Sequence, residues 1–214
     1  MAFSFPRIYP ILDSSVLPVS GRVDYLWDLG RALLGSGVTL FEYRDKSGSD
    51  DEVCADAEIL RRAMPLSADL KLILDDRAHL VEQLGFDGVH VDAGDVSVDE
   101  ARRLLGPDAI VGTFAGSDVL IPRILDEPAD YFAIGPVFTT TTKQTDKPPI
   151  GIEGVRRLRS QAGPGPVLTA AAGITMETAA QVLEAGATTV AVAAAIFRAA
   201  DPAAEFRRWR ERLG

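Results

Sequence analysis

Short apolar runs alternate with longer segments in which apolar residues recur at helical spacing along almost the whole chain. The runs have a composition typical of strands, and the segments between them have the period of amphipathic helices. Eight strands are predicted, at residues 7–12, 38–43, 71–74, 88–91, 109–113, 131–134, 166–170 and 188–192. The helices predicted between them include 24–34, 51–64, 77–84 and 98–105. This alternation indicates consecutive βα units around a parallel sheet.

Three similar stretches, 84–91, 128–135 and 185–192, each join the end of a helix to an apolar run. Glycine after a helix is the expected left-handed cap, and the apolar run is typical of a strand buried on both faces. Eight such units predict an α/β fold, a (β/α)8 TIM barrel formed as one domain by residues 1–214, with its active site at the C-terminal ends of the strands. An open doubly wound sheet is the alternative. Its glycine-rich phosphate loop is missing after the first strand, where Asp13-Ser14-Ser15 stand instead.

Composition and charge narrow the classes of partner. The 214 residues are 47% hydrophobic, which suffices for one sizeable core, and the formal net charge is −9. Neither nucleic acid nor a membrane is expected as a partner, so a bound phosphate needs a local cationic site. Cys54 has no disulfide partner and is predicted to be a buried small residue. Since no leader or membrane-spanning pattern is found, we expect a soluble, cytoplasmic protein.

Charged and polar residues stand at the ends of several predicted strands. Because these ends share one face of a barrel, the side chains are expected to converge. After strands two, three, four and six they are Glu42, Arg44, Asp45, Lys46, Asp75, Asp76, Arg77, His90, Asp92, Asp95, Thr140, Thr142 and Lys143. Small residues follow the last two strands, at Gly173, Ala193 and Ala194, and let backbone N–H groups approach an anion.

Two carboxylates beside three cations predict a site for magnesium and a polyphosphate. Mg²⁺ binds one or two carboxylates together with substrate phosphate oxygens, and cations neutralise the remaining charge. The carboxylates are Asp76 and Asp95, and the cations are Arg44, Lys46 and Lys143. Two alternatives stay open: Asp76 as a helix N-cap, and Arg44 with Lys46 as a solvated charged turn.

Other residues have simpler interpretations. Lys143 lies in an irregular segment, 139–151, that is long enough to cover a substrate. His90 ends a buried strand and is expected to be a hydrogen-bonded structural histidine, with an active-site role as the alternative. His79 is expected to be structural. Trp27 and Trp209 occupy helical positions and are predicted to pack in the core.

Taken together, four segments resemble the thiamine-phosphate synthase family, whose close relatives include the thiazole tautomerases. The segments are Thr39-Leu40-Phe41-Glu42-Tyr43-Arg44-Asp45-Lys46, Leu74-Asp75-Asp76-Arg77, Gly88-Val89-His90-Val91 and Gly135-Pro136-Val137-Phe138-Thr139-Thr140-Thr141-Thr142-Lys143. The resemblance covers nearly the whole chain. It implies a transferase that joins 4-amino-2-methyl-5-hydroxymethylpyrimidine diphosphate to a thiazole phosphate and releases pyrophosphate.

The resemblance also implies roles for residues. Magnesium would be held by Asp76 and Asp95, and the diphosphate by Arg44, Lys46 and Lys143, the three residues expected to be catalytic. The thiazole phosphate would be held by Thr140 and Thr142 with the backbone at Gly173, Ala193 and Ala194. The whole implied substrate site consists of Glu42, Tyr43, Arg44, Asp45, Lys46, Asp75, Thr140, Thr141, Thr142, Lys143, Gly173, Ala193 and Ala194. The partners implied are small phosphorylated molecules; assembly into a homo-oligomer is left open.

Several positions depart from the family pattern. Glu42 and Asp75 replace a glutamine and an asparagine, Phe114 and Gly116 a serine and a histidine, and Ala194 a serine. The two extra carboxylates would repel a diphosphate unless they pair with Arg44 or Arg77, unless additional magnesium binds, or unless the substrate carries less negative charge. Two alternative functions therefore stay open. One is a tautomerase-like isomerase; that branch commonly lacks an aspartate at this position, so Asp76 argues against it. The other is a noncatalytic barrel that binds a phosphorylated metabolite; it has less need of Asp76, Asp95 and Lys143, so these residues argue against it.

Overall fold

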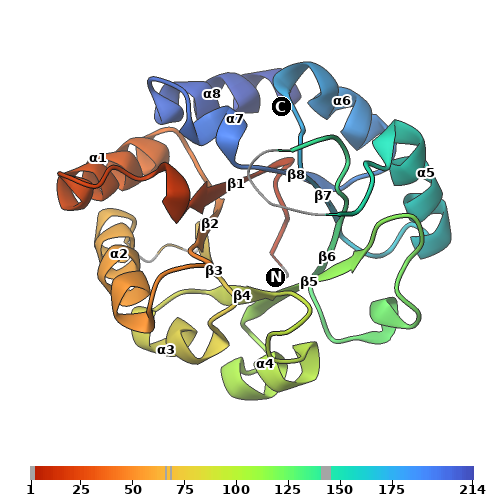
Figure 1. Cartoon of the computed structure of the whole chain (residues 1–214), viewed down its shortest axis with the longest axis horizontal. Coiled ribbons are helices and arrows are strands. Elements are labelled where there is room, and N and C mark those ends of the chain that lie inside the picture. The colour runs from red at the N-terminus through yellow and green to blue at the C-terminus, as the bar shows by residue number, and fades with distance from the viewer. Residues whose placement is uncertain (1–2, 66, 68, 141–145) are drawn as a thin grey trace.

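The computed structural model describes residues 3–65, 67, 69–140 and 146–214. Its eight strands form a closed parallel barrel in which each strand pairs with the next and β8 pairs with β1 (Figure 1). The strands are β1 (Ile8–Asp13), β2 (Leu40–Arg44), β3 (Lys71–Asp75), β4 (Gly88–Val91), β5 (Ile110–Gly116), β6 (Tyr131–Ile134), β7 (Leu168–Ala171) and β8 (Thr189–Val192). The predicted TIM barrel is confirmed.

Helices surround the barrel as an outer ring (Figure 1). They are α1 (Arg22–Gly35), α2 (Asp50–Ala63), α3 (Val81–Leu84), α4 (Val98–Leu105), α5 (Gly151–Ala162), α6 (Met176–Glu184), α7 (Ala194–Phe197) and α8 (Pro202–Leu213). Three short 3-10 helices supplement them: η1 (Ser14–Val16), η2 (Ala78–Leu80) and η3 (Ile124–Asp126). Between β5 and β6, η3 stands where the other units have an α-helix. None of the helices described is long and apolar enough to cross a membrane.

Local sequence explains where the best-defined helices begin. Ser49 caps α2 by accepting a hydrogen bond from the backbone of Glu52, whose side chain bonds back to the Ser49 backbone. Ser97 caps α4 in a similar way, through the backbone N–H of Glu100. The first backbone N–H groups of a helix have no hydrogen-bond partner within the helix. Because the two serine caps satisfy such groups, α2 begins at Asp50 and α4 begins at Val98.

The side chains of each strand alternate between the barrel interior and the helix layer. The interior near the N-terminal ends of the strands is filled by a small cluster of Tyr9, Leu40, Ile73, Ile110, Tyr131 and Ala191, against which Phe3 and Phe5 pack. Gly112 makes room for it, because a Cβ there would lie 2.0 Å from the Tyr131 ring. The filled end leaves the C-terminal half of the barrel available for a cavity.

Some details differ from the sequence-based predictions. The third predicted helix, 77–84, divides into η2 and the short α3, because Asp76 has a left-handed backbone with φ 68° and delays the helix start. Trp27 was expected in the core, but it is 45% exposed on α1, so that prediction is wrong. Its position in the sequence has helical spacing, yet it falls on the solvent side of the helix. Trp209 is 1% exposed, as predicted, and Cys54 is partly buried against the core.

Candidate active site

A cavity of about 840 Å³ opens at the C-terminal ends of the strands. Its two sides differ in chemistry. The side formed by β1–β4 and their loops carries most of the charge, with Asp13, Glu42, Arg44, Lys46, Asp75, Asp76, His90, Asp92 and Asp95. On the other side, the lining residues of β5–β8 and those directly after β6 and β7 are neutral and mostly small: Phe114, Ala133, Ile134, Gly135, Pro136, Thr169, Ala171, Ala172 and Ala191. Lys147 reaches this side from the segment after β6. We call these the charged wall and the neutral wall.

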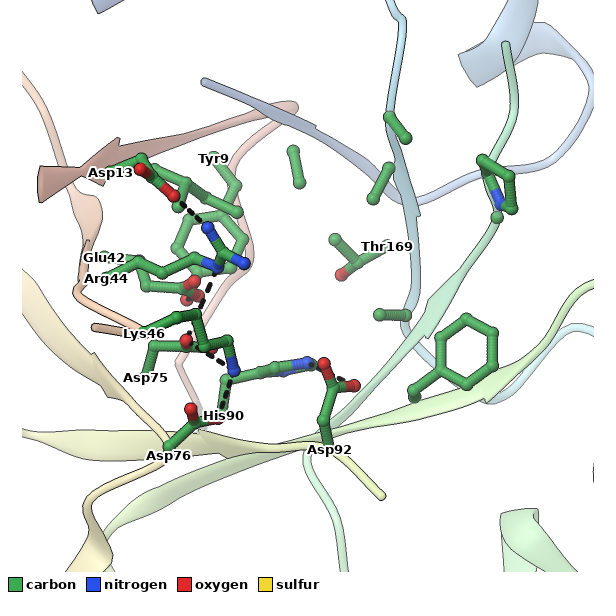
Figure 2. Close-up of a pocket in the computed structure, with 18 of the residues that line it drawn as sticks. Tyr9, Asp13, Glu42, Arg44, Lys46, Asp75, Asp76, His90, Asp92 and Thr169 are labelled. Carbon is green, nitrogen blue, oxygen red and sulfur yellow. Dashed lines mark hydrogen bonds and ion pairs between the residues drawn. The ribbon is translucent and has the colours of Figure 1, made fainter. Parts of the chain in front are cut away.

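The charged wall contains a network of ion pairs centred on Arg44 and Lys46 (Figure 2). Arg44 bonds to Asp13, its register partner on β1, and its Nε lies 3.5 Å from Oδ2 of Asp75. The Nζ of Lys46 lies 2.8 Å from the same Asp75 oxygen and also bonds to Asp76. The alternative of a solvated charged turn is therefore wrong, because both cations line the cavity and pair with carboxylates, of which Asp13 and Asp75 are buried.

Asp75, which departs from the family pattern, is paired with the cations of this network. Asp75 is 3% exposed and lies 2.8 Å from Lys46 and 3.5 Å from Arg44, so the expected pairing of Asp75 with Arg44 is present, with Lys46 as the nearer cation. Arg77 makes no such contribution. Its guanidinium instead bonds to the backbone oxygens of Asp45 and Gly48, both at 2.6 Å, and to Asp50.

Burial and pairing act in opposite directions on the two partners. Burial raises the pKa of Asp75, and the nearby Lys46 ammonium only partly offsets this. Burial alone would lower the pKa of Lys46, but the carboxylates of Asp75 and Asp76 hold it above its ordinary value. Lys46 therefore stays protonated at neutral pH and presents a fixed positive charge to the cavity.

Asp76 and Asp95 come from neighbouring loops and meet at the rim. Burial raises the pKa of Asp95, and a hydrogen bond with the Asp76 side chain raises it further. Asp95 also accepts the backbone N–H of Asp92 at 2.8 Å. The N-cap alternative for Asp76 is wrong, because η2 begins after Arg77 without a side-chain cap and Asp76 faces Lys46. Two carboxyl groups in contact suit a proton or a cation between them.

A chain of hydrogen bonds forms the floor of the cavity. The Tyr9 hydroxyl donates to Oε2 of Glu42 at 2.6 Å and lies 3.1 Å from the Tyr131 hydroxyl, which lies 3.1 Å from Nδ1 of His90. The His90 ring stacks on Tyr131, and its Nε2 lies 3.7 Å from Asp92. His90 is hydrogen-bonded, as expected, and its ring also lines the cavity, so an active-site role stays open beside the structural one.

Burial raises the pKa of Glu42 to about 7, with a further contribution from the Asp75 carboxylate. His90 behaves differently: burial would lower its pKa, but the Asp92 carboxylate and then Glu42 raise it above the ordinary value. The floor therefore combines a glutamic acid and a histidine that both have raised pKa values.

Five described residues of the implied site do not line the cavity: Tyr43, Asp45, Gly173, Ala193 and Ala194. The first two are held elsewhere by other contacts. The Tyr43 hydroxyl donates to Asp56 of α2, and Asp45 accepts backbone N–H groups of Ser47 and Gly48 at 3.0 and 2.8 Å. Both side chains point away from the barrel interior because inward and outward positions alternate, and Glu42 and Arg44 take the inward ones. Their contacts stabilise the strand and the loop that follows it.

Of the residues expected at the thiazole phosphate, only Thr140 is found in the cavity lining of the described chain. Thr141, Thr142 and Lys143 lie outside the described residues. Gly173 has a left-handed φ of 67°, and a Cβ there would lie 2.5 Å from the Thr139 carbonyl oxygen, so the loops after β6 and β7 approach closely. Ala193 and Ala194 stand at the start of α7.

Sequence reasoning missed many of the residues that line the cavity, among them Asp13, Tyr9, Thr169, Tyr131 and Lys147. Tyr9 and Thr169 lie at inward strand positions, and strand alternation was the signal that could have identified them. Tyr131 is brought to the floor by space at Gly112, which no local pattern reveals. Lys147 places its Nζ 4.1 Å from the ring centre of Phe114. Phe114 thus replaces a polar contact of the family with a ring that faces a cation.

Comparisons with known proteins agree with these features. A model of the family described as thiamine monophosphate synthase matches residues 8–196. The thiamine-phosphate synthase of Koribacter versatilis (strain Ellin345) is 37% identical over 189 residues, 88% of each chain. That of Agrobacterium fabrum is 36% identical over 210 residues, 97% of this chain and 93% of the other. The structure of thiamine phosphate pyrophosphorylase from Pyrococcus furiosus has a TM-score of 0.74 at 26% identity and covers 97% of both chains. This chain belongs to the thiamine monophosphate synthase family.

Proposed function

We propose that this protein is a thiamine-phosphate synthase, which joins 4-amino-2-methyl-5-hydroxymethylpyrimidine diphosphate to a thiazole phosphate and releases pyrophosphate. Family membership supports the reaction class. The observation that carries the assignment to this site is the pair of inward cations, Arg44 and Lys46, held at the cavity by the carboxylates of Asp13, Asp75 and Asp76.

The two cations would bind the diphosphate and stabilise the charge that grows on pyrophosphate as it departs. Each is already oriented by carboxylates, so little reorganisation is needed when the substrate arrives. Lys143, outside the described residues, would add a third positive charge from the loop after β6. Thr140 and Lys147, the residues of the cavity lining that precede and follow Lys143 in the sequence, are both described.

Asp76 and Asp95 fit magnesium as a shared ligand pair. Mg²⁺ needs only one or two carboxylates when substrate phosphates provide the other oxygens. No group of three potential metal-ligating side chains occurs among the described residues. Held by these two carboxylates, magnesium would supply positive charge that offsets the negative charge of the diphosphate.

The neutral wall would hold the rings and the second phosphate. The backbone at Gly173, Ala193 and Ala194, together with Thr140, Thr141 and Thr142, would bind the thiazole phosphate. The neutral wall would exclude water from the reacting carbon. This exclusion matters because water would otherwise capture the activated pyrimidine in place of the thiazole nitrogen. Substrates of this kind are small and phosphorylated, and we place the reaction in the cytoplasm.

The experiment combines the purified protein with both substrates and magnesium and follows pyrophosphate and thiamine phosphate. Lys46→Ala should lose about a hundredfold in rate. Lys71→Ala is the matched control: Lys71 also pairs with a carboxylate, Asp87 at 2.8 Å, but at the N-terminal end of β3, away from the cavity. Equal loss in both variants, or none in either, would argue against the proposed site.

A further inference from the structure

Thr169 is a polar residue on the neutral wall with no assigned role. It lies on β7, is 2% exposed, and lines the cavity. Its Oγ1 has no hydrogen-bond partner among the residues that the structure describes. Leaving a buried hydroxyl unpaired destabilises a protein, so a hydroxyl that faces a cavity in this way is suited to a bound molecule.

The position of Thr169 relates it to the deep part of the cavity. It precedes the end of β7 by two residues, as Glu42 precedes the end of β2 by two, so both lie one inward position below the rim. Figure 2 shows Thr169 across the cavity from Glu42 and from the ion pairs of Arg44 and Lys46. On the neutral wall, the inward neighbours of Thr169 include Ala133 and Ala171, which offer no polar side-chain atom.

This placement separates Thr169 from the charges that would bind the diphosphate. Arg44, Lys46, Asp76 and Asp95 are on the opposite side or at the rim, whereas the floor beside Thr169 is made by aromatic residues such as Tyr9 and Tyr131. A flat ring with hydrogen-bonding atoms on its edges suits a space bounded by aromatic rings, alanines and one hydroxyl. A phosphate does not.

We propose that the Thr169 hydroxyl hydrogen-bonds a nitrogen on the edge of the substrate's aminopyrimidine ring and thereby helps to select that ring. The inference rests on the proposed function and adds a specificity-determining residue to it. Thr169 acts in binding and orientation of the ring; it takes no part in bond breaking.

Thr189 provides a matched control within the same barrel. It is the register partner of Thr169 on β8, is 0% exposed, and also has an Oγ1 without a partner among the described residues. Unlike Thr169, it is not part of the cavity lining. Replacing either threonine with valine keeps the side-chain shape and removes an unpaired hydroxyl, so both variants should fold and have a Tm no lower than that of the wild type.

The test compares steady-state kinetics of Thr169→Val, Thr169→Ser and Thr189→Val with each substrate varied in turn. We expect Thr169→Val to lose roughly tenfold or more in kcat/KM for the pyrimidine diphosphate, with the KM for the thiazole phosphate unchanged. Thr169→Ser, which keeps the hydroxyl, should stay within about threefold of wild type, and Thr189→Val should match wild type.

Wild-type kinetics in Thr169→Val together with a raised Tm would overturn the inference, because the hydroxyl would then be only an unpaired core group. An equal change in both KM values would also overturn it. Binding of the free hydroxymethyl aminopyrimidine, measured by calorimetry, separates this inference from the reaction itself. If the wild type is inactive, weaker binding to Thr169→Val alone still supports the inference, and equal or absent binding rejects it.

Discussion

Glu42 on β2 accepts a 2.6 Å hydrogen bond from the hydroxyl of Tyr9 on β1, in a part of the barrel where Glu42 is 2% exposed and Tyr9 is 1% exposed. A neutral donor thus satisfies a carboxyl group that forms no ion pair within the described part of the chain, while the cations nearby pair with Asp13, Asp75 and Asp76. The family pattern has glutamine at this position. The acid is therefore a liability for the folded state wherever it is ionised.

Glu42→Gln should make stability less dependent on pH. Burial raises the pKa of Glu42 from 4.5 to about 7, so the folded state binds this proton more tightly than the unfolded state. The resulting stability is fully present below about pH 4.5 and is lost as pH rises through about 7. A shift from 4.5 to about 7 corresponds to on the order of 3 kcal/mol.

The measurement is the free energy of unfolding of both proteins between pH 5 and pH 8, a range of about three units around the raised pKa. The two should be similar at the acidic end, and Glu42→Gln should be the more stable at the alkaline end. A difference that is constant across this range would show that Glu42 does not titrate there.

Lys46→Ala should lower both stability and turnover. Adding Asp75→Asn to this variant should restore the stability but not the turnover. Without Lys46, the buried Asp75 keeps Arg44 at 3.5 Å as its remaining cation partner in the described network. Since Lys46 is one-third exposed, we expect a cost of about 1–2 kcal/mol, smaller than for a fully buried pair. Neutralising Asp75 in the same protein removes that cost.

The lost turnover should remain, because the charge that stabilises the leaving pyrophosphate is still missing. Thermal melts and initial rates of the single and double variants test both halves. Recovery of near-normal turnover in Lys46→Ala with Asp75→Asn would mean that Lys46 serves only to neutralise Asp75.

Activity should require a divalent cation, and Asp76→Ala or Asp95→Ala should remove most of it. The two carboxyl groups share a hydrogen bond at the rim, a position suited to a bound cation. Rates are measured over a magnesium titration, with EDTA as the metal-free reference. Full activity in EDTA would remove magnesium from the mechanism.

Lys143→Ala should lower kcat more than it raises KM. The proposed function assigns Lys143 to the charge that develops on the leaving group, and losing one such contact costs roughly 3 kcal/mol of barrier, about a hundredfold in rate. Lys71→Ala is again the control. Normal kcat with a raised KM would show that Lys143 only anchors the substrate.

The barrel and the charged wall were predictable because both follow from local patterns. Strand periodicity placed Arg44, Asp75 and Asp76 at strand ends, and closure of a parallel barrel brings such ends together. Periodicity also predicts that Tyr43 faces away from Glu42 and Arg44, but the resemblance treated the whole segment as one site. Alternation along a strand is thus the better guide to which residues of a motif reach the ligand.

The floor of the cavity was not predictable because its contacts are non-local. Tyr9 and Tyr131 touch across 122 positions of sequence, and the Tyr131 ring fits only because Gly112 lacks a side chain. Trp27 was misplaced for a different reason. Helical spacing indicates a helix, but which side of that helix faces solvent depends on where the barrel lies. The missing partner of Thr169 could be seen only after its neighbours were placed.

The most direct test of the proposed reaction is the stoichiometry of its two products. Purified protein is incubated with the pyrimidine diphosphate, the thiazole phosphate and magnesium, and pyrophosphate and thiamine phosphate are quantified by mass spectrometry. We predict one thiamine phosphate for each pyrophosphate released, at a rate that Lys46→Ala lowers about a hundredfold. Pyrophosphate release without thiamine phosphate, or no release at all, would contradict the assignment of this site as a thiamine-phosphate synthase.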